Sequence, residues 1–169
     1  IPVHLLGNAK QLRWLQAPAA APTAGYYYYD LIAHPVQITN FREIYNDHIA
    51  SYIMSLVLAF AKGLHVYIPQ QHRREWRPGY APTYLPDSTA IVVGVGGIGA
   101  ETARLCSEFG MTVLGIDPRR PDAPPGVAEL HRPDSLGDVL PRGDFVIVTV
   151  PETPETQGMF AAAQFASMK

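Results

Sequence analysis

The segment TAIVVGVGGIGAETARLCSEFGMTVLGIDPRR, residues 89–120, decides the fold of this chain. It begins with the short apolar run AIVVGV, which is typical of a buried strand. A helical pattern follows from residue 98 to residue 109 and ends at Gly110, and TVLGI is a second apolar strand. Strand, helix and strand in this order favour two parallel strands joined by a helix. The segment therefore predicts an α/β fold built on a parallel sheet.

A glycine pattern lies between the first strand and the helix. Gly94, Gly96 and Gly99 form G-x-G-x-x-G, and Asp117 ends the second strand 18 residues after Gly99. This arrangement is close to the dinucleotide-binding fingerprint, in which an acidic residue follows after about 20 residues. Gly94 permits a tight turn, Gly96 leaves space for a pyrophosphate, and Gly99 lets the helix pack close to the strand. The alternative is a glycine-rich turn that binds nothing.

The residues after these glycines predict how a dinucleotide would be held. The backbone N–H groups of Gly97 and Ile98 would hold the phosphates at the positive end of the helix dipole. Asp117 would accept hydrogen bonds from both adenosine ribose hydroxyls, and its charge would repel a 2′-phosphate. We therefore expect NAD as the cofactor. NADP stays open as an alternative, because Arg119 and Arg120 follow at once and could bind such a phosphate.

Further elements surround this segment. Downstream, VAEL is a weak third strand, DFVIVTV is a fourth, and AAAQFASMK has a helical pattern. Upstream, QLRWLQAP is apolar enough for a short strand or a helix end, and VQITN is a short β-branched strand. The polar, proline-rich stretch QQHRREWRPGYAPTYLPDS predicts a helix end followed by a linker. The whole pattern predicts a Rossmann-type, doubly wound parallel sheet preceded by part of a smaller α/β unit.

One long amphipathic helix is expected in DHIASYIMSLVLAFAKGLHVYI, with Asn46 or Asp47 capping its start. Its predicted buried face consists of Ile49, Ile53, Leu56, Val57, Phe60 and Leu64. We expect three regions: part of a smaller α/β unit in residues 1–41, a long helix and linker in residues 42–85, and the first part of an NAD(P)-binding domain in residues 86–169.

The composition excludes several classes of protein. The 169 residues are 47% hydrophobic and 17% charged, with a net charge of −2, so we expect a packed core and no attraction to nucleic acid. Cys106 is the single cysteine, so no internal disulfide can form, and a reducing cytoplasm is expected. No histidine pair has the spacing of metal ligands, so no metal site is expected either. The longest apolar helical run is shorter than the ~20 residues that span a bilayer, so no membrane partner is expected.

Five ordered motifs resemble the D-isomer-specific 2-hydroxyacid dehydrogenases, a family that includes glyoxylate/hydroxypyruvate reductases, phosphoglycerate dehydrogenases and formate dehydrogenases. The motifs are LRWLQAP with TAGYYYYDLI, VQITNFREIYNDHIASYIMSLVLAFAKGL, QHRREW, GVGGIGAETARLCSEFGMTVLGIDP, and DFVIVTVPETPETQGMF. The resemblance implies hydride transfer between a nicotinamide cofactor and a small 2-hydroxy or 2-oxo acid. It also implies a homodimer built through the cofactor domain, and a smaller substrate domain with a flavodoxin-like fold.

The resemblance also implies a substrate site near the start of the chain. The backbone N–H groups of Ala24, Gly25 and Tyr26 would receive the substrate carboxylate, since adjacent backbone donors form an anion nest. An ordinary surface turn is the alternative for this stretch.

Four further residues would lie beside the cofactor according to the resemblance. Val150, Pro151 and Thr156 follow the fourth strand, with Pro151 shaping the wall of the site. The alternative for this stretch is a plain loop between a strand and a helix. His48 would contact the cofactor phosphate or nicotinamide from the start of the long helix, or would act in capping that helix.

The family's catalytic arginine, glutamate and histidine would follow SMK in the family order, so we map no catalytic residue onto this sequence. We expect the chain to be a fragment that lacks both ends of its parent and is inactive alone. The sequence departs from the family at Ser51, where an acidic residue is common, and at Glu43, where glycine is common. A cofactor-sensing binding protein of the same fold, similar to transcriptional corepressors, is the alternative function, and an inactive cofactor-binding fragment is another.

Overall fold

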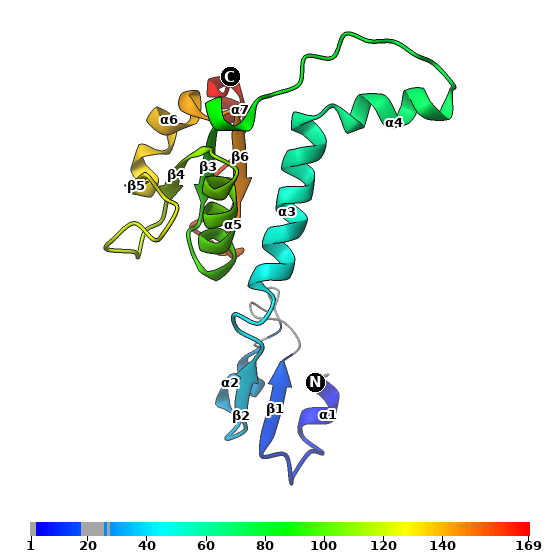
Figure 1. The fold of residues 1–169 in the computed structure, drawn as a ribbon. Coiled ribbons are helices and arrows are strands. Elements are labelled where there is room, and N and C mark those ends of the chain that lie inside the picture. The colour runs from blue at the N-terminus through cyan, green and yellow to red at the C-terminus, as the bar shows by residue number, and fades with distance from the viewer. Residues whose placement is uncertain (1–2, 18–25, 27) are drawn as a thin grey trace. The chain divides into compact units, whose positions relative to one another are not determined.

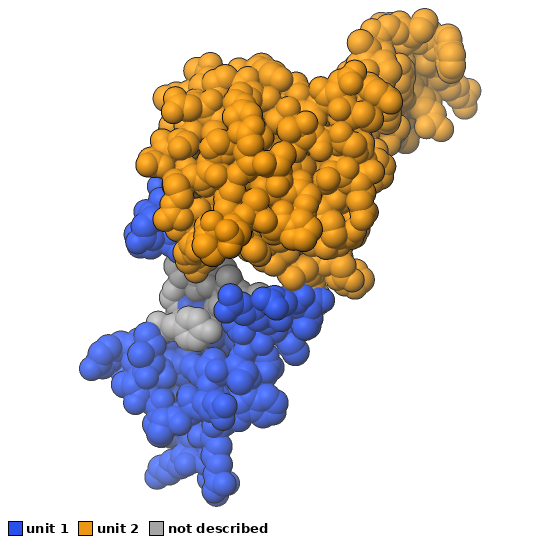
Figure 2. All heavy atoms as spheres, turned by 60° about the vertical axis from the view of Figure 1, so that its left-hand side comes forward, with its two compact units in different colours: residues 1–44, 151–157 blue, residues 45–150, 158–169 orange. Residues whose placement is uncertain are grey.

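The computed structural model describes residues 3–17, 26 and 28–169. The chain forms two compact units, one of residues 1–44 with 151–157 and one of residues 45–150 with 158–169, which we call the small and the large unit (Figure 2). Their assignment to a substrate domain and a cofactor domain, with the boundaries given above, stays a prediction.

The small unit contains a two-stranded parallel sheet. Strand β1 (Trp14–Ala17) pairs in parallel with β2 (Gln37–Asn40), so QLRWLQAP forms a strand and not a helix end. Two short helices accompany the sheet, α1 (Val3–Leu6) and α2 (Tyr29–Ala33). The unit buries a small apolar cluster of Leu6, Leu31 and Val36.

The large unit contains a four-stranded parallel sheet, as the sequence predicts (Figure 1). Its strands are β3 (Thr89–Val93), β4 (Thr112–Ile116), β5 (Glu129–His131) and β6 (Phe145–Val148). Their order in the sheet is β5-β4-β3-β6, and all neighbours are parallel. The strand β3 from which the glycine pattern emerges is therefore central, and its carboxyl end lies between the ends of β4 and β6.

Apolar clusters cover both faces of this sheet, because successive side chains of a strand point to opposite faces. On one face, Ala90 and Val92 of β3 pack with residues of α3 (Asn46–Ala61) and α5 (Gly97–Glu108). On the other face, Ile91 and Val93 pack with residues of α6 (Leu136–Val139) and the turn after it. The remaining elements are α4 (Leu64–His72), α7 (Ala162–Ser167) and the 3-10 turns Leu85–Asp87, Pro133–Ser135 and Leu140–Arg142.

The predicted buried face of the long helix is largely wrong. The buried residues of α3 are Ala50, Met54, Val57 and Ala61, whereas Ile49, Leu56, Phe60 and Leu64 of the predicted face are exposed. Small side chains at both ends of the buried stripe let α3 lie close to α5, so the larger apolar residues stay outside. The predicted cap is also wrong, because Tyr45 occupies the cap position and both Asn46 and Asp47 already belong to the helix.

A sharp bend separates α3 from α4. Gly63 has a φ of +71°, a left-handed conformation that favours glycine, and the two helix axes differ by 71°. A Cβ on Gly63 would lie 2.5 Å from the Tyr80 ring, and the Tyr80 hydroxyl donates a hydrogen bond to the Phe60 carbonyl at 2.7 Å. Thr83 N–H donates to the Ala61 carbonyl at 2.8 Å. The predicted single helix is therefore two helices, and we call residues 64–84 the arm.

No single helix among the described residues is long and apolar enough to cross a membrane. Among these described helices, the pair α3 and α4 reaches that length and composition when taken together, across a bend of 71°. Cys106 of α5 is fully buried, and its Sγ lies 3.4 Å from Met54 Sδ. Burial raises the pKa of the Cys106 thiol to about 11, so it packs as an apolar side chain and is not a nucleophile at neutral pH.

Candidate functional site

The first glycine of the pattern turns the chain at the carboxyl end of β3. Gly94 has a φ of +90°, and its N–H donates a hydrogen bond to the Ile116 carbonyl of β4 at 2.7 Å. A Cβ at this position would lie 2.8 Å from Val150 Cγ1 and 3.0 Å from the Thr149 carbonyl carbon. Gly94 is therefore required both by its backbone conformation and by the close approach of the segment after β6.

Gly99 is the most tightly enclosed glycine of the loop. A Cβ on Gly99 would lie 2.0 Å from the Gly94 carbonyl oxygen and 2.7 Å from Thr149 Oγ1. The Thr149 hydroxyl donates a hydrogen bond to that same carbonyl at 2.6 Å. Thr149 therefore holds the glycine loop, residues 94–99, in place from the end of the neighbouring strand. Thr149 is not among the predicted site residues, although its position directly after DFVIV, at the same sheet edge as Gly94, points to this role.

The middle of the loop is open. Gly96 occupies the cap position of α5, and a Cβ placed on it would meet nothing within 4 Å. No side chain in the described ranges caps α5, and the first intrahelical hydrogen bond there runs from Ala100 N–H to the Gly96 carbonyl. The N–H groups of Gly97, Ile98 and Gly99 precede that bond and have no partner within the helix. The residues present therefore fit a phosphate group, which takes hydrogen bonds from such donors.

Asp117 lies beside this loop and is 6% exposed. Its Oδ2 accepts a hydrogen bond from Val95 N–H at 2.9 Å. Its Oδ1 accepts from the N–H groups of Arg119 and Arg120 at 2.8 and 3.2 Å. A carboxylate has about four acceptor positions, so three are used and one remains. The carboxylate thus joins the loop to the turn after β4. It has room for about one further hydrogen-bond donor, whereas the prediction from the sequence was that it accepts from two ribose hydroxyls.

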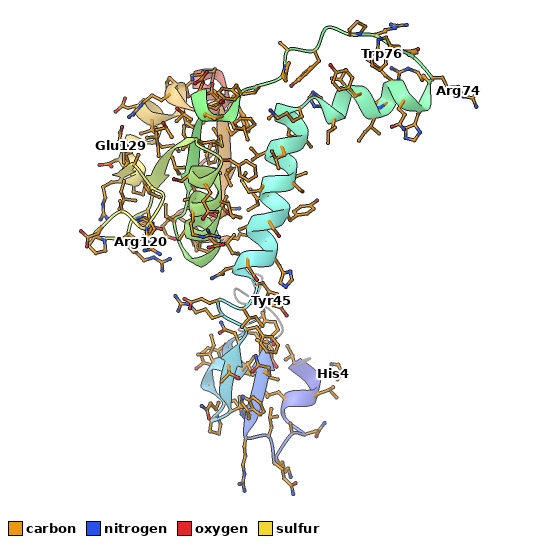
Figure 3. The ribbon with its side chains drawn as sticks, in the orientation of Figure 1. His4, Tyr45, Arg74, Trp76, Arg120 and Glu129 are labelled. Atoms are coloured by element: carbon orange, nitrogen blue, oxygen red, sulfur yellow. The ribbon has the colours of Figure 1, made fainter. Side chains whose placement is uncertain are left out.

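The two arginines after Asp117 differ in their surroundings. Arg119 is exposed, whereas Arg120 is half-buried and its Nε donates a hydrogen bond to the Val95 carbonyl (Figure 3). Arg120 is therefore already bound to the backbone of the glycine loop, and Arg119 is the arginine whose side chain extends into solvent.

The segment after β6 is divided between the two units. Val150 belongs to the large unit, and its Cγ1 lies 2.8 Å from the place that a Cβ on Gly94 would take, so it borders the glycine loop. Pro151 and Thr156 belong to the small unit. There the Thr156 hydroxyl donates a hydrogen bond to the Pro151 carbonyl at 2.6 Å and accepts one from Thr153 N–H at 2.9 Å. These contacts close a compact turn, and the predicted cofactor contacts of Pro151 and Thr156 stay a prediction.

The other predicted site residues stand as follows. His48 is exposed in the first turn of α3, where its N–H donates a hydrogen bond to Asp47 Oδ1 at 2.8 Å. Ala24 and Gly25 lie outside the described residues, and Tyr26 is half-buried in a bend. In the part of the chain that the structure describes, no three His, Cys, Asp or Glu side chains gather as a metal site would require.

Comparison with known protein families identifies the region that carries this site. The family described as "D-isomer specific 2-hydroxyacid dehydrogenase, NAD binding domain" matches residues 54–169, which is more than half of the chain. The match begins within α3 and includes the whole glycine loop, Asp117 and the sheet that positions them.

Individual relatives agree with this match. The chain is 30% identical over 122 residues to a D-3-phosphoglycerate dehydrogenase of Methanocaldococcus jannaschii, with 72% of this chain and 23% of the relative covered. It is 32% identical over 143 residues to a glyoxylate reductase of Thermococcus kodakarensis, with 79% and 42% covered. The chain thus spans less than half the length of these relatives.

A solved structure has the same fold. It is a D-isomer specific 2-hydroxyacid dehydrogenase of Xanthobacter autotrophicus Py2 in complex with NADPH and MES. The TM-score is 0.82 at 26% identity, and the similarity covers 99% of this chain and 52% of that one.

Proposed function

The chain belongs to the D-isomer specific 2-hydroxyacid dehydrogenase family, and on this premise we propose the reaction of the full-length protein. It transfers a hydride between a nicotinamide cofactor and a small 2-hydroxy or 2-oxo acid. The observation that carries the proposal is the loop at the end of β3, which has an open Gly96, an uncapped helix α5 and a buried carboxylate at Asp117. The cofactor supplies the hydride chemistry, and residues 94–99 and 117 bind and orient it.

Each of the remaining predicted residues has a place in this proposal. Gly97 and Ile98 donate backbone N–H groups to the phosphates, Val150 borders the site, and His48 approaches the cofactor from α3. The catalytic arginine, glutamate and histidine of the family follow residue 169 in the family order. Residues 1–169 therefore supply the cofactor half of the active site and hold no group assigned to proton transfer.

We propose NAD as the cofactor. The one unused acceptor position of Asp117 suits a ribose hydroxyl, which has a hydrogen to donate, whereas a 2′-phosphate dianion has none. NADP is the alternative, favoured by the exposed guanidinium of Arg119 and by the NADPH bound in the Xanthobacter relative. Comparing the affinities of NADH and NADPH by fluorescence titration decides between them.

The decisive experiment for the reaction uses the full-length protein. Glyoxylate or hydroxypyruvate is added with NADH or NADPH, and the absorbance of the reduced cofactor is followed. Turnover is expected with at least one pair. Cofactor binding without turnover of any 2-oxo acid would instead support a cofactor-sensing protein of the same fold, and absence of cofactor binding would contradict both functions.

We also propose a homodimer formed through the large unit. Tyr52, Phe60 and Trp76 are 66%, 55% and 92% exposed, which leaves large apolar side chains of α3 and the arm in water. Side chains of this size gather at protein interfaces. Sedimentation equilibrium of the full-length protein tests the proposal, since a monomer at micromolar concentration would contradict it.

A further inference from the structure

Gly97 occupies a position of G-x-G-x-x-G at which the fingerprint does not require glycine. The structure nevertheless shows why a side chain does not fit there. Its φ is not positive, so its backbone conformation does not demand glycine. A Cβ on Gly97 would instead lie 2.6 Å from Nδ2, 2.8 Å from Oδ1 and 3.0 Å from Cγ of Asn46. The carboxamide of Asn46 thus occupies the space that a side chain at position 97 would take.

Asn46 reaches this place because α3 packs along α5. Both helices bury their facing sides in one apolar cluster, with Met54 of α3 against Cys106 of α5. Asn46 is the first residue of α3, half-buried, and lies at the first turn of α5. No hydrogen bond joins its carboxamide to another described residue, and no unpaired polar side-chain atom among those residues is shut off from solvent, so the carboxamide N and O atoms are accessible. An accessible carboxamide at the first turn of α5 can therefore donate a hydrogen bond to a ligand held at that turn.

We propose that Asn46 is a positioning residue for the cofactor pyrophosphate. Its Nδ2 donates a hydrogen bond to a phosphate oxygen, beside the N–H groups of Gly97 and Ile98. The inference rests on the function proposed above and adds a side-chain donor to a loop that otherwise offers backbone donors. Because this donor belongs to α3, binding of the phosphates also fixes the start of that helix against the glycine loop.

The test compares two ligands that differ in the pyrophosphate. ADP carries it and adenosine does not, so loss of a phosphate contact weakens ADP alone. In the full-length protein, Asn46→Ala is expected to weaken ADP binding about tenfold, as for a lost hydrogen bond to a charged group. Asn46→Asp is expected to weaken it further, by a factor that shrinks at high salt because the added charge repels phosphate. Adenosine binding should stay within about twofold for both variants.

The matched control is Ser55→Ala on the same helix, where the exposed hydroxyl donates a hydrogen bond to the Tyr52 carbonyl of its own helix at 2.7 Å. Affinities are measured by calorimetry for ADP and by NMR titration for adenosine, with melting temperatures recorded for every variant. Equal weakening of both ligands, or unchanged ADP binding in Asn46→Asp, would overturn the role of Asn46. If the unmodified protein fails to bind ADP, NADH and NADPH, the proposed function fails instead, so the two failures are distinguishable.

A double-mutant cycle tests the contact itself. Gly97→Ala displaces the Asn46 carboxamide, so it should weaken ADP binding in the unmodified protein but have little further effect when Asn46→Ala is already present. Additive effects of the two substitutions would show that Gly97 and Asn46 act independently and would contradict the inference.

Discussion

The glycine loop and the arm are two connecting segments of the large unit, and they differ in how closely they are packed. In the loop, backbone meets backbone so closely that a Cβ on Gly99 would lie 2.0 Å from a carbonyl oxygen. In the arm, large apolar side chains such as Ile68 and Trp76 are 48% and 92% exposed. The comparison teaches that close backbone packing distinguishes the loop from the arm, and that apolar content alone does not bury a segment.

The largest effect is expected from Gly99→Ala. Because the new methyl group would collide with the Gly94 carbonyl, the free energy of unfolding should fall by about 3 kcal/mol. The matched control is Gly96→Ala, whose Cβ meets nothing and should change that free energy by less than about 1 kcal/mol while weakening cofactor binding. Urea denaturation measures both. Equal stabilities of the two variants would show that the loop is as adaptable as the arm.

Asp117→Asn is expected to have the next largest effect. The amide nitrogen of asparagine cannot accept a hydrogen bond, so at least one of the N–H groups of Val95, Arg119 and Arg120 loses its partner. A loss of about 2 kcal/mol in unfolding free energy follows. The exposed Asp122→Asn, in the loop after the same strand, is the control. If both substitutions leave the stability unchanged, the carboxylate does not hold the loop, and Asp117 would act on the cofactor alone.

Thr149→Val tests a single hydrogen bond. It removes the hydroxyl that donates to the Gly94 carbonyl and keeps the side-chain volume, so a cost of about 1 kcal/mol is expected. Thr149→Ser should restore most of this stability, because it keeps the hydroxyl. Thr112→Val on the exposed side of β4 should be close to neutral. Failure of the serine variant to recover stability would assign the effect to packing of the threonine methyl group.

A smaller and pH-dependent effect is expected at Glu129, on the outer strand of the same sheet (Figure 3). Hydrogen bonds from Arg142 at 2.6 and 2.9 Å lower the pKa of Glu129 to about 2. Partial desolvation opposes this shift of the pKa, and a hydrogen bond with His131 adds to it. The unfolded-state pKa is about 4.3, so the pair stabilises the fold above that pH and loses this effect as the pH falls toward 2.

Melting temperatures of the unmodified protein and Glu129→Gln should therefore differ slightly at pH 6 and converge toward pH 3. The exposed Glu152→Gln serves as the control. The effect is small because Glu129 and Arg142 are both about half exposed to water. A difference that stays constant across this pH range would rule out the ion pair as its source.

The smallest effect on folding is expected from Trp76→Ala in the arm. Because 92% of this residue is exposed, the unfolding free energy of the monomer should change by less than about 0.5 kcal/mol. The measurement is made at protein concentrations that sedimentation shows to be monomeric, since the same substitution should weaken the proposed dimer. A loss above about 1 kcal/mol in the monomer would break the comparison between the arm and the loop.

The sequence predicted those parts of the fold that local pattern encodes. The strands β3 and β4, and the helix between them, follow from apolar runs and glycines, and the structure places them within a residue or two of the predicted bounds. The buried face of α3 could not be predicted in this way, because two apolar stripes compete there. Which stripe is buried depends on the small residues Ala50 and Ala61 and on their fit against α5.

The contacts of the site were harder still to predict. Thr149 and Asn46 lie about 50 residues from the glycines they contact, and no periodicity relates such distant positions. A local departure was easier to explain afterwards. Glu43, where the family commonly has glycine, has a φ of +72°, a conformation that costs a non-glycine residue about 1 kcal/mol. A glycine at position 43 would adopt this conformation without that cost.

The base of the arm has a consequence for how this fold can vary. The Tyr80 ring fills the space beside Gly63, and Thr83 bonds the Ala61 carbonyl, so the outgoing and returning chains meet at the end of α3. Between them lie α4 and a stretch without regular structure, and both ends of this connection are held at the end of α3. Doubling the length of a flexible loop between fixed ends costs only about 0.6 kcal/mol. The stretch between residues 63 and 80 is thus a place where segments of other lengths could be grafted, and where evolution can exchange a surface while leaving the sheet and its glycine loop unchanged.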